Sequence, residues 1–190
     1  MAGWCGIPKS LSLASTVMTE TPTTTKTDGD PNGIDPSNDR IFLCVIDSTE
    51  EVRVAIRFAS RRAARTGGRV ALLYVIEPAE FQHWMSVEEK MREERRDEAE
   101  RVLQQHASEV HDICTTMPAL YVREGSPAEA IQQLIEEEPR IAILVLGAGT
   151  GKKGPGPLVS SIAGKLSGKF PIPITVVPGN LNDEQIDALT

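Results

Sequence analysis

Residues 41–51 read IFLCVIDSTEE, a continuous apolar run that passes directly into a polar turn. The run Ile41–Ile46 is typical of a strand covered on both faces, because a strand with one face in water alternates apolar and polar side chains. Ser48 and Glu51 stand at the spacing of a capping box, which predicts a helix from this turn to about Thr66. A buried strand followed at once by a helix is the opening of an α/β fold.

The same alternation of buried strand and helix continues along the chain. Further strands are expected at residues 70–76, 119–123, 141–146 and 172–177, and further helices at about 86–110, 126–138 and 158–169. The helices that begin at Ser86 and Ser126 open with the same capping-box spacing. Pro171 and Pro173 cannot donate ladder hydrogen bonds, so we expect the last strand at a sheet edge. Five strands alternating with four helices predict one doubly wound, five-stranded parallel sheet with right-handed crossovers.

Composition and charge divide the chain of 190 residues into three parts. Residues 1–39 are rich in Thr, Pro, Gly and Ser and have few large apolar side chains, which predicts a disordered N-terminal extension. Residues 40–178 form the expected domain and carry a net charge of −1, whereas residues 1–39 and 179–190 carry −3 each. The last segment is therefore interpreted as an acidic C-terminal tail.

The same composition excludes several classes of protein. A net charge of −7 argues against nucleic acid as a partner. No window approaches the ~18 consecutive apolar residues of a membrane span, so no membrane partner is expected. The three cysteines are widely spaced and predict neither a disulfide framework nor a zinc cluster, which favours a cytoplasmic location. The three histidines suggest no metal site, and the arginines of the first helix favour a solvated face over a polyanion patch.

Candidate binding residues follow the ends of the predicted strands. In open α/β sheets, ligands bind beyond the carboxyl ends of the strands, where Asp47, Gly125 and Gly147 are expected. The loop at residues 147–156 reads GAGTGKKGPG and leads into a helix, an arrangement that can present backbone N–H groups to a phosphate. Lys152 could add a positive charge there. The alternative is a flexible connection whose lysines are solvated.

At this point the segments point to a known family. The strand end Asp47-Ser48, the sequence GSPAEAI at 125–131, the strand end ILVLG at 143–147 and the closing FPIPITVV at 170–177 together resemble the universal stress protein family. The resemblance covers about residues 40–178. It implies the strand order 3-2-1-4-5, an adenine nucleotide alpha-hydrolase-like fold, a homodimer often formed through the last strand, and, in many members, bound ATP.

The resemblance also implies roles for particular residues. Asp47 would accept a hydrogen bond from the adenine edge, Val75 would line the base pocket, and Gly125 would lie near the ribose. The phosphates would be faced by Gly147, Gly149, Ser160 and Ser161. The family's phosphate motif is Gly-x-x-Gly, nine residues, then Gly-Ser/Thr, and here Thr150 and Ser160 stand at its second and third glycines.

Two function classes follow. The first is a cytoplasmic stress-response regulator or sensor that binds an adenine nucleotide such as ATP. The alternative is a dimeric interaction module with a vestigial pocket. No catalytic arrangement of nucleophile and base is legible, so an enzyme is not expected, although slow ATP hydrolysis stays open.

Overall fold

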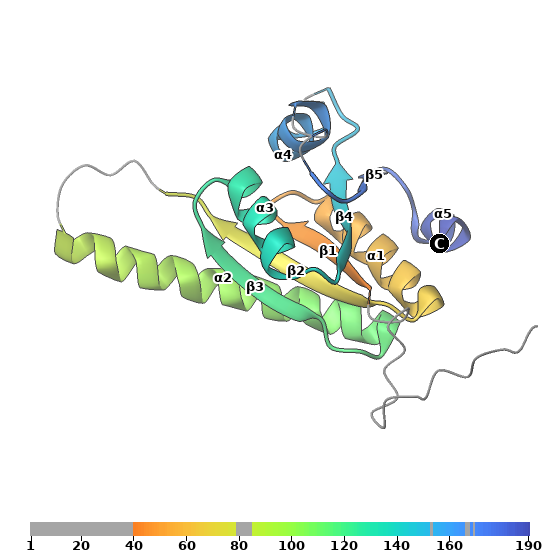
Figure 1. Ribbon diagram of the computed structural model, residues 1–190, viewed down its shortest axis with the longest axis horizontal. Helices are drawn as coiled ribbons and strands as arrows, with labels where there is room; N and C mark the ends of the chain where they lie inside the picture. The colour runs from red at the N-terminus through yellow and green to blue at the C-terminus, as the bar shows by residue number, and fades with distance from the viewer. Residues whose placement is uncertain (1–39, 79–84, 153, 166–167, 169) are drawn as a thin grey trace, which may run out of the picture. The chain divides into compact units, whose positions relative to one another are not determined.

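The computed structural model describes residues 40–190 except 79–84, 153, 166–167 and 169 (Figure 1). The predicted disordered extension, residues 1–39, lies outside the described residues. The described chain forms one parallel sheet in the order β3-β2-β1-β4-β5, which confirms the predicted fold class, strand order and edge position of β5. The strands are β1 (Ile41–Ile46), β2 (Arg69–Ile76), β3 (Ala119–Glu124), β4 (Ile141–Ala148) and β5 (Ile174–Pro178).

Helices cover both faces of this sheet (Figure 1). One face is covered by α1 (Val52–Thr66) and α2 (Met85–Cys114). The other is covered by α3 (Pro127–Glu137), α4 (Pro157–Val159) and the π-helix η2 (Ser160–Lys165). None of the described helices has the length and apolarity needed to cross a membrane.

The central strand β1 is buried along its whole length, as its apolar run predicts. Its side chains alternate between the two faces: Leu43 and Val45 pack with α3, whereas Phe42 and Cys44 pack with α1 and α2. Burial raises the pKa of the Cys44 thiol, so this side chain acts as a small apolar group of the core.

The turn before α1 differs from the predicted capping box. Ser48 does not cap the helix; Glu51 occupies the N-cap position and makes no side-chain cap hydrogen bond. Instead, Oδ1 of Asp47 accepts hydrogen bonds from the Thr49 N–H at 2.9 Å and the Thr49 hydroxyl at 2.6 Å. An aspartate that bonds two residues ahead closes a tight turn, so Asp47 itself sets the entry to α1. At α3, Ser126 likewise gives no side-chain cap, and Pro127 stands at the first helical position.

The predicted helix at 158–169 is only partly regular. Up to Lys165 it consists of the three residues of α4, which begins at Pro157, followed by the π-helical turn of η2, whereas residues 166–167 and 169 lie outside the described residues. Ser160, Ser161 and Gly164 are weak helix formers, and wider π turns often occur at functional sites.

The segment 179–190, interpreted from its charge as an acidic tail, contains helix α5 (Asp183–Leu189). Its start is a formed capping box: the Gln185 N–H donates to Oδ1 of Asn182 at 2.8 Å, and the Asn182 N–H donates to Oε1 of Gln185 at 3.0 Å. Ile186 of this helix is buried, and α5 packs against α1.

Charged pairs hold α5 against α1. Arg57 donates to Oδ2 of Asp187 at 2.9 Å and lies 3.1 Å from Asp183, while Arg61 donates to Oδ1 of Asp187 at 2.9 Å. These arginines of α1 therefore have acidic partners within the chain and do not form a purely solvated face. Although desolvation acts to raise the pKa of Asp187, hydrogen bonds and charge attraction from Arg57 and Arg61 outweigh it and hold that pKa below its ordinary value.

The docking of α5 is therefore expected to weaken in acid. Above about pH 5 the Asp187 carboxylate is ionised in both states and its stabilisation is complete; as the pH falls through the ordinary pKa of about 3.9 towards the lower folded value, that stabilisation is lost. In Asp187→Asn, the melting temperature should therefore fall less between neutral and acid pH than it does in the wild-type protein. Thermal melts between neutral and acid pH measure it. The control is Glu184→Gln, an exposed acid of the same helix, and an equal change in both variants would contradict the prediction.

Candidate functional site

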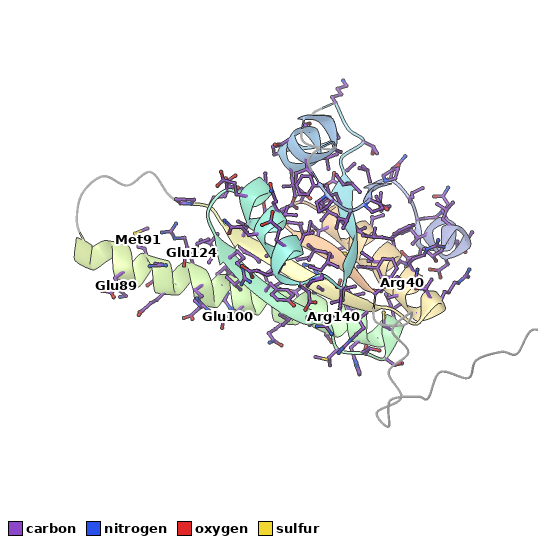
Figure 2. All side chains as sticks on the ribbon, in the orientation of Figure 1. Arg40, Glu89, Met91, Glu100, Glu124 and Arg140 are labelled. Carbon is purple, nitrogen blue, oxygen red and sulfur yellow. The ribbon has the colours of Figure 1, made fainter. Side chains whose placement is uncertain are left out.

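A cavity of about 440 Å³ lies at the carboxyl ends of β1 and β2. We call it the strand-end cavity. Arg40 and Arg140, labelled in Figure 2, precede β1 and β4 and mark the opposite, amino ends of the strands. The residues that line the cavity are Val45, Ile46, Asp47, Ser48, Thr49, Tyr74, Val75, Glu77, Ser126, Pro127, Ala128, Pro157, Leu158, Ser161 and Ile162.

The strand-end cavity has apolar walls and a few polar groups. Val75, Leu158 and Ile162 supply apolar surface from three separate elements, β2, α4 and η2. Polar atoms come from one side through the turn that begins at Asp47 and from the others through Glu77, Ser126 and Ser161. Small-molecule sites usually have volumes of about 300–1,000 Å³, apolar walls and a small number of placed polar groups, so this cavity has the properties of a ligand site.

Two carboxylates line this cavity, Glu77 after β2 and Asp47 at the end of the central strand, and the second is held in a turn by Thr49. Asp47 is therefore the carboxylate with a defined position. Its Oδ1 is engaged by both groups of Thr49, which fixes the orientation of the side chain. Within the part of the chain that the structure describes, Oδ2 has no hydrogen-bond partner and is available to accept one from a ligand.

The glycine-rich loop after β4 borders a second cavity, of about 300 Å³, which we call the loop cavity. Its lining residues are Asp47, Thr49, Glu51, Gly147, Gly149 and residues 154–159. The loop closes on itself: the Gly149 N–H donates to the Pro155 carbonyl at 3.3 Å, and the Gly154 N–H donates to the Gly151 carbonyl at 3.0 Å. These two amides are therefore engaged within the loop and do not point to a ligand.

Three glycines from two segments, the end of β4 with its loop and the residue after β5, lie against Glu51. A Cβ added to Gly147 would overlap the Glu51 carbonyl oxygen and lie 2.8 Å from its carbon, and one added to Gly149 would lie 3.2 Å from Oε1 of Glu51. A Cβ on Gly179, just after β5, would overlap Cγ of Glu51. The absence of side chains at these glycines thus makes room for Glu51, the N-cap residue of α1.

The eight residues predicted for the site fall into three groups. Asp47, Val75 and Ser161 come together around the strand-end cavity. Gly147 and Gly149 border the loop cavity beside it.

The third group lies outside both cavities. Lys152 and Ser160 are exposed. Gly125 does not line either cavity; it forms the turn after β3 with a φ of 124°, and its N–H donates to the Ile76 carbonyl at 3.0 Å. At that φ glycine is required for the turn itself.

Sequence reasoning missed several lining residues. Tyr74 and Glu77 flank the predicted Val75, and Ser126–Ala128 follow the predicted Gly125. The rule that ligands bind beyond strand ends would have found them had it been applied to neighbours as well as to the terminal residue. Glu51 carried no such signal, because its position depends on glycines about 100 residues away in sequence.

A larger hollow of about 890 Å³ lies between α1, α2 and the segment before α5. It is lined mostly by charged and polar side chains of both signs, among them Glu50, Arg53, Glu109 and Asp112. We prefer the strand-end cavity as the candidate site, because it combines apolar walls with few polar groups and lies where parallel sheets bind ligands. No group of three or more metal-ligating side chains is found in the described ranges.

Comparison with known proteins identifies the class. The universal stress protein family model matches residues 39–178, and the chain belongs to this family. No curated protein matches the chain.

Solved structures show the same fold. Universal stress protein UspA from Lactobacillus plantarum is 19% identical, with a TM-score of 0.60 over 73% of this chain and 97% of that one. A universal stress protein family protein from Arabidopsis thaliana, solved with AMP bound, is 15% identical, with a TM-score of 0.52 over 76% and 94%. A universal stress protein in complex with cAMP is 14% identical, with a TM-score of 0.53 over 75% and 98%.

The two cavities differ in how well they fit an adenine nucleotide. The strand-end cavity offers an acceptor oxygen and apolar walls, which suit a purine base. The loop cavity does not fit a triphosphate, because Glu51 lies among its glycines and the Gly149 and Gly154 amides are already bonded.

The contact between Gly147 and Glu51 generates a stability test. Gly147→Ala should destabilise the fold by about 1–3 kcal/mol, because the added methyl group meets backbone atoms of Glu51 that cannot move without shifting α1. Gly151→Ala is the matched control, since nothing lies within 4 Å of its added Cβ, and it should stay within about 0.5 kcal/mol. Urea unfolding measures both, and similar values for the two variants would refute the packing role of Gly147.

Proposed function

We propose that this protein binds an adenine nucleotide in the strand-end cavity and acts as a cytoplasmic stress-response regulator or sensor. The observation that carries the proposal is Oδ2 of Asp47, an acceptor with no partner among the described residues, at a cavity with apolar walls. Membership of the universal stress protein family supports it. The solved universal stress proteins with AMP and with cAMP share the fold of this chain.

Different residues of the strand-end cavity would bind different parts of the nucleotide. The exocyclic amine of adenine is a donor, and Asp47 would accept its hydrogen bond. Val75 and Leu158 would cover the faces of the base, which removes apolar surface from water. Ser161 or Ser126 would meet hydroxyl groups of the ribose.

Such a site acts by binding. A ligand that binds only the folded state stabilises it by mass action, by about 2.7 kcal/mol when its concentration is 100 times Kd. Occupancy of the cavity would therefore change with nucleotide concentration and be transmitted through the two elements that Asp47 joins, β1 and the entry to α1.

Adenosine and inosine test the role of Asp47. Inosine has a carbonyl oxygen where adenosine has the amine, so the wild-type protein should prefer adenosine. Asp47→Asn keeps an oxygen for the turn with Thr49 but replaces the second acceptor with a donor. Adenosine should then bind about tenfold more weakly and inosine no more weakly than before, measured by isothermal titration calorimetry.

Asp112→Asn provides the control for the loss of one negative charge. Asp112 lines the larger hollow and not the strand-end cavity. Asp112→Asn should leave the affinity for adenosine and the affinity for inosine unchanged. The proposal fails if wild-type protein binds neither nucleoside, and the role of Asp47 fails if its variant retains the preference for adenosine.

We also propose a homodimer formed through β5. This strand has β4 on one side and forms an edge of the sheet, and Val176 on it is a large apolar side chain with 38% exposure. An edge strand with an exposed apolar side chain is a ready template for pairing with another strand.

Substitution of the edge tests the dimer. Val176→Lys places a charge on the edge strand and should convert the dimer to a monomer in analytical ultracentrifugation. Leu189→Lys, at an exposed apolar residue of α5, should leave the dimer intact. A monomeric wild type, or a dimer that persists in Val176→Lys, would rule out this interface.

A further inference from the structure

We propose that Glu51 determines which adenine ligands the site accepts, and that it selects the nucleoside or the nucleoside monophosphate against ADP and ATP. This inference rests on the proposed function, because it concerns the part of the same ligand that lies beyond the base and ribose. It follows from the disagreement between the glycine-rich loop, whose composition suggests a phosphate site, and the side chain found among its glycines.

The position of Glu51 is fixed by backbone on several sides. It stands at the N-cap of α1 with helical φ and ψ, and its carbonyl accepts the first helical hydrogen bond, from the Ala55 N–H at 3.3 Å. Gly147 lies directly against that backbone, and Gly179 lies against the Glu51 side chain. A Cβ added to Gly179 would lie 3.1 Å from Cβ of Glu51. Because these contacts hold its main chain, the Glu51 backbone cannot leave this place without a shift of α1, and its side chain starts from a fixed point beside the loop.

The carboxylate end of Glu51 points to the loop. Its Oε1 lies 3.2 Å from the Cβ position of Gly149, in the loop cavity next to the strand-end cavity. Asp47, Thr49, Pro157 and Leu158 line both cavities, so a ligand that fills the first has its next groups directed towards the second.

The charges around this place do not favour a polyphosphate. Within the described ranges Glu51 makes no ion pair, and Asp47 adds a second carboxylate to the wall that the two cavities share. Lys152 is exposed and lines neither cavity. Like charges within a few ångströms repel strongly where water is partly excluded, and the bonded amides of Gly149 and Gly154 cannot offset that repulsion.

The ligand class follows from these contacts. Adenosine brings no charge to the loop cavity, and AMP brings one phosphate that can stay in solvent. ADP and ATP extend the chain of phosphates into the space beside Glu51. The expected order of affinity is therefore adenosine and AMP first, then ADP, then ATP.

Calorimetric titration of the full chain with adenosine, AMP, ADP and ATP, at fixed ionic strength and without divalent cations, tests the inference. Wild-type protein should bind ATP about tenfold more weakly than adenosine. Glu51→Gln keeps the shape that the glycines enclose and removes the charge, so the ratio of ATP to adenosine dissociation constants should fall about fivefold while adenosine binding stays within about twofold.

Glu50→Gln is the matched control. Glu50 is the exposed neighbour of Glu51 and, unlike Glu51, does not line the loop cavity, so its substitution should leave the ratio unchanged. The wild-type ratio tests the inference even if Glu51→Gln does not fold, which its melting temperature reveals.

The outcomes separate the two proposals. If adenosine binds and wild-type protein binds ATP equally well or better, or if Glu51→Gln folds and keeps the wild-type ratio, the role of Glu51 is overturned and nucleotide binding stands. If none of the four ligands binds, both are overturned.

Discussion

The amino end of α1 lies so close to the carboxyl ends of β4 and β5 that neither Gly147 nor Gly179 has room for a side chain against Glu51. Three features depend on this approach. It places the turn of Asp47 and Thr49 beside the glycine-rich loop, so that the same residues line both cavities. It directs the Glu51 carboxylate into the loop, and it sets Gly179, the residue after β5, against the Glu51 side chain. The contact between the backbones of Gly147 and Glu51 thus determines both how α1 packs on the sheet and which groups line the candidate site.

Local sequence patterns predict the sheet well, because a strand buried on both faces needs an unbroken apolar run, as in Ile41–Ile46. They predict α5 poorly. Its partners on α1, Arg57 and Arg61, lie 130 and 126 residues before Asp187, and no local pattern records an attraction over that separation. The helix expected at 158–169 becomes α4 and η2 for a local reason, the weak helix propensity of its serines and glycine.

Of the predicted residues that line the strand-end cavity, Asp47 follows from the rule on strand ends, whereas Val75 and Ser161 follow from the resemblance to the family. The candidate site was not predictable at the glycines. A sequence does not distinguish a glycine whose missing Cβ makes room for a phosphate from one whose missing Cβ makes room for another part of the chain. For Gly147 and Gly149, the structure shows the second case, with Glu51 as the neighbour. For Gly125, the backbone angle alone accounts for the residue.

Helix α5 has seven residues, fewer than the ~12–15 at which an isolated helix becomes even marginally stable in water. Its order therefore depends on its attachment to α1, which combines one buried side chain, Ile186, with charged pairs that are partly open to solvent. Dissolved salt shortens the reach of such charges from about 10 Å at 0.1 M to about 3 Å at 1 M, while it leaves the apolar sheet intact. The attachment of α5 thus makes the end of this chain responsive to the ionic strength of its surroundings, independently of any ligand in the cavities.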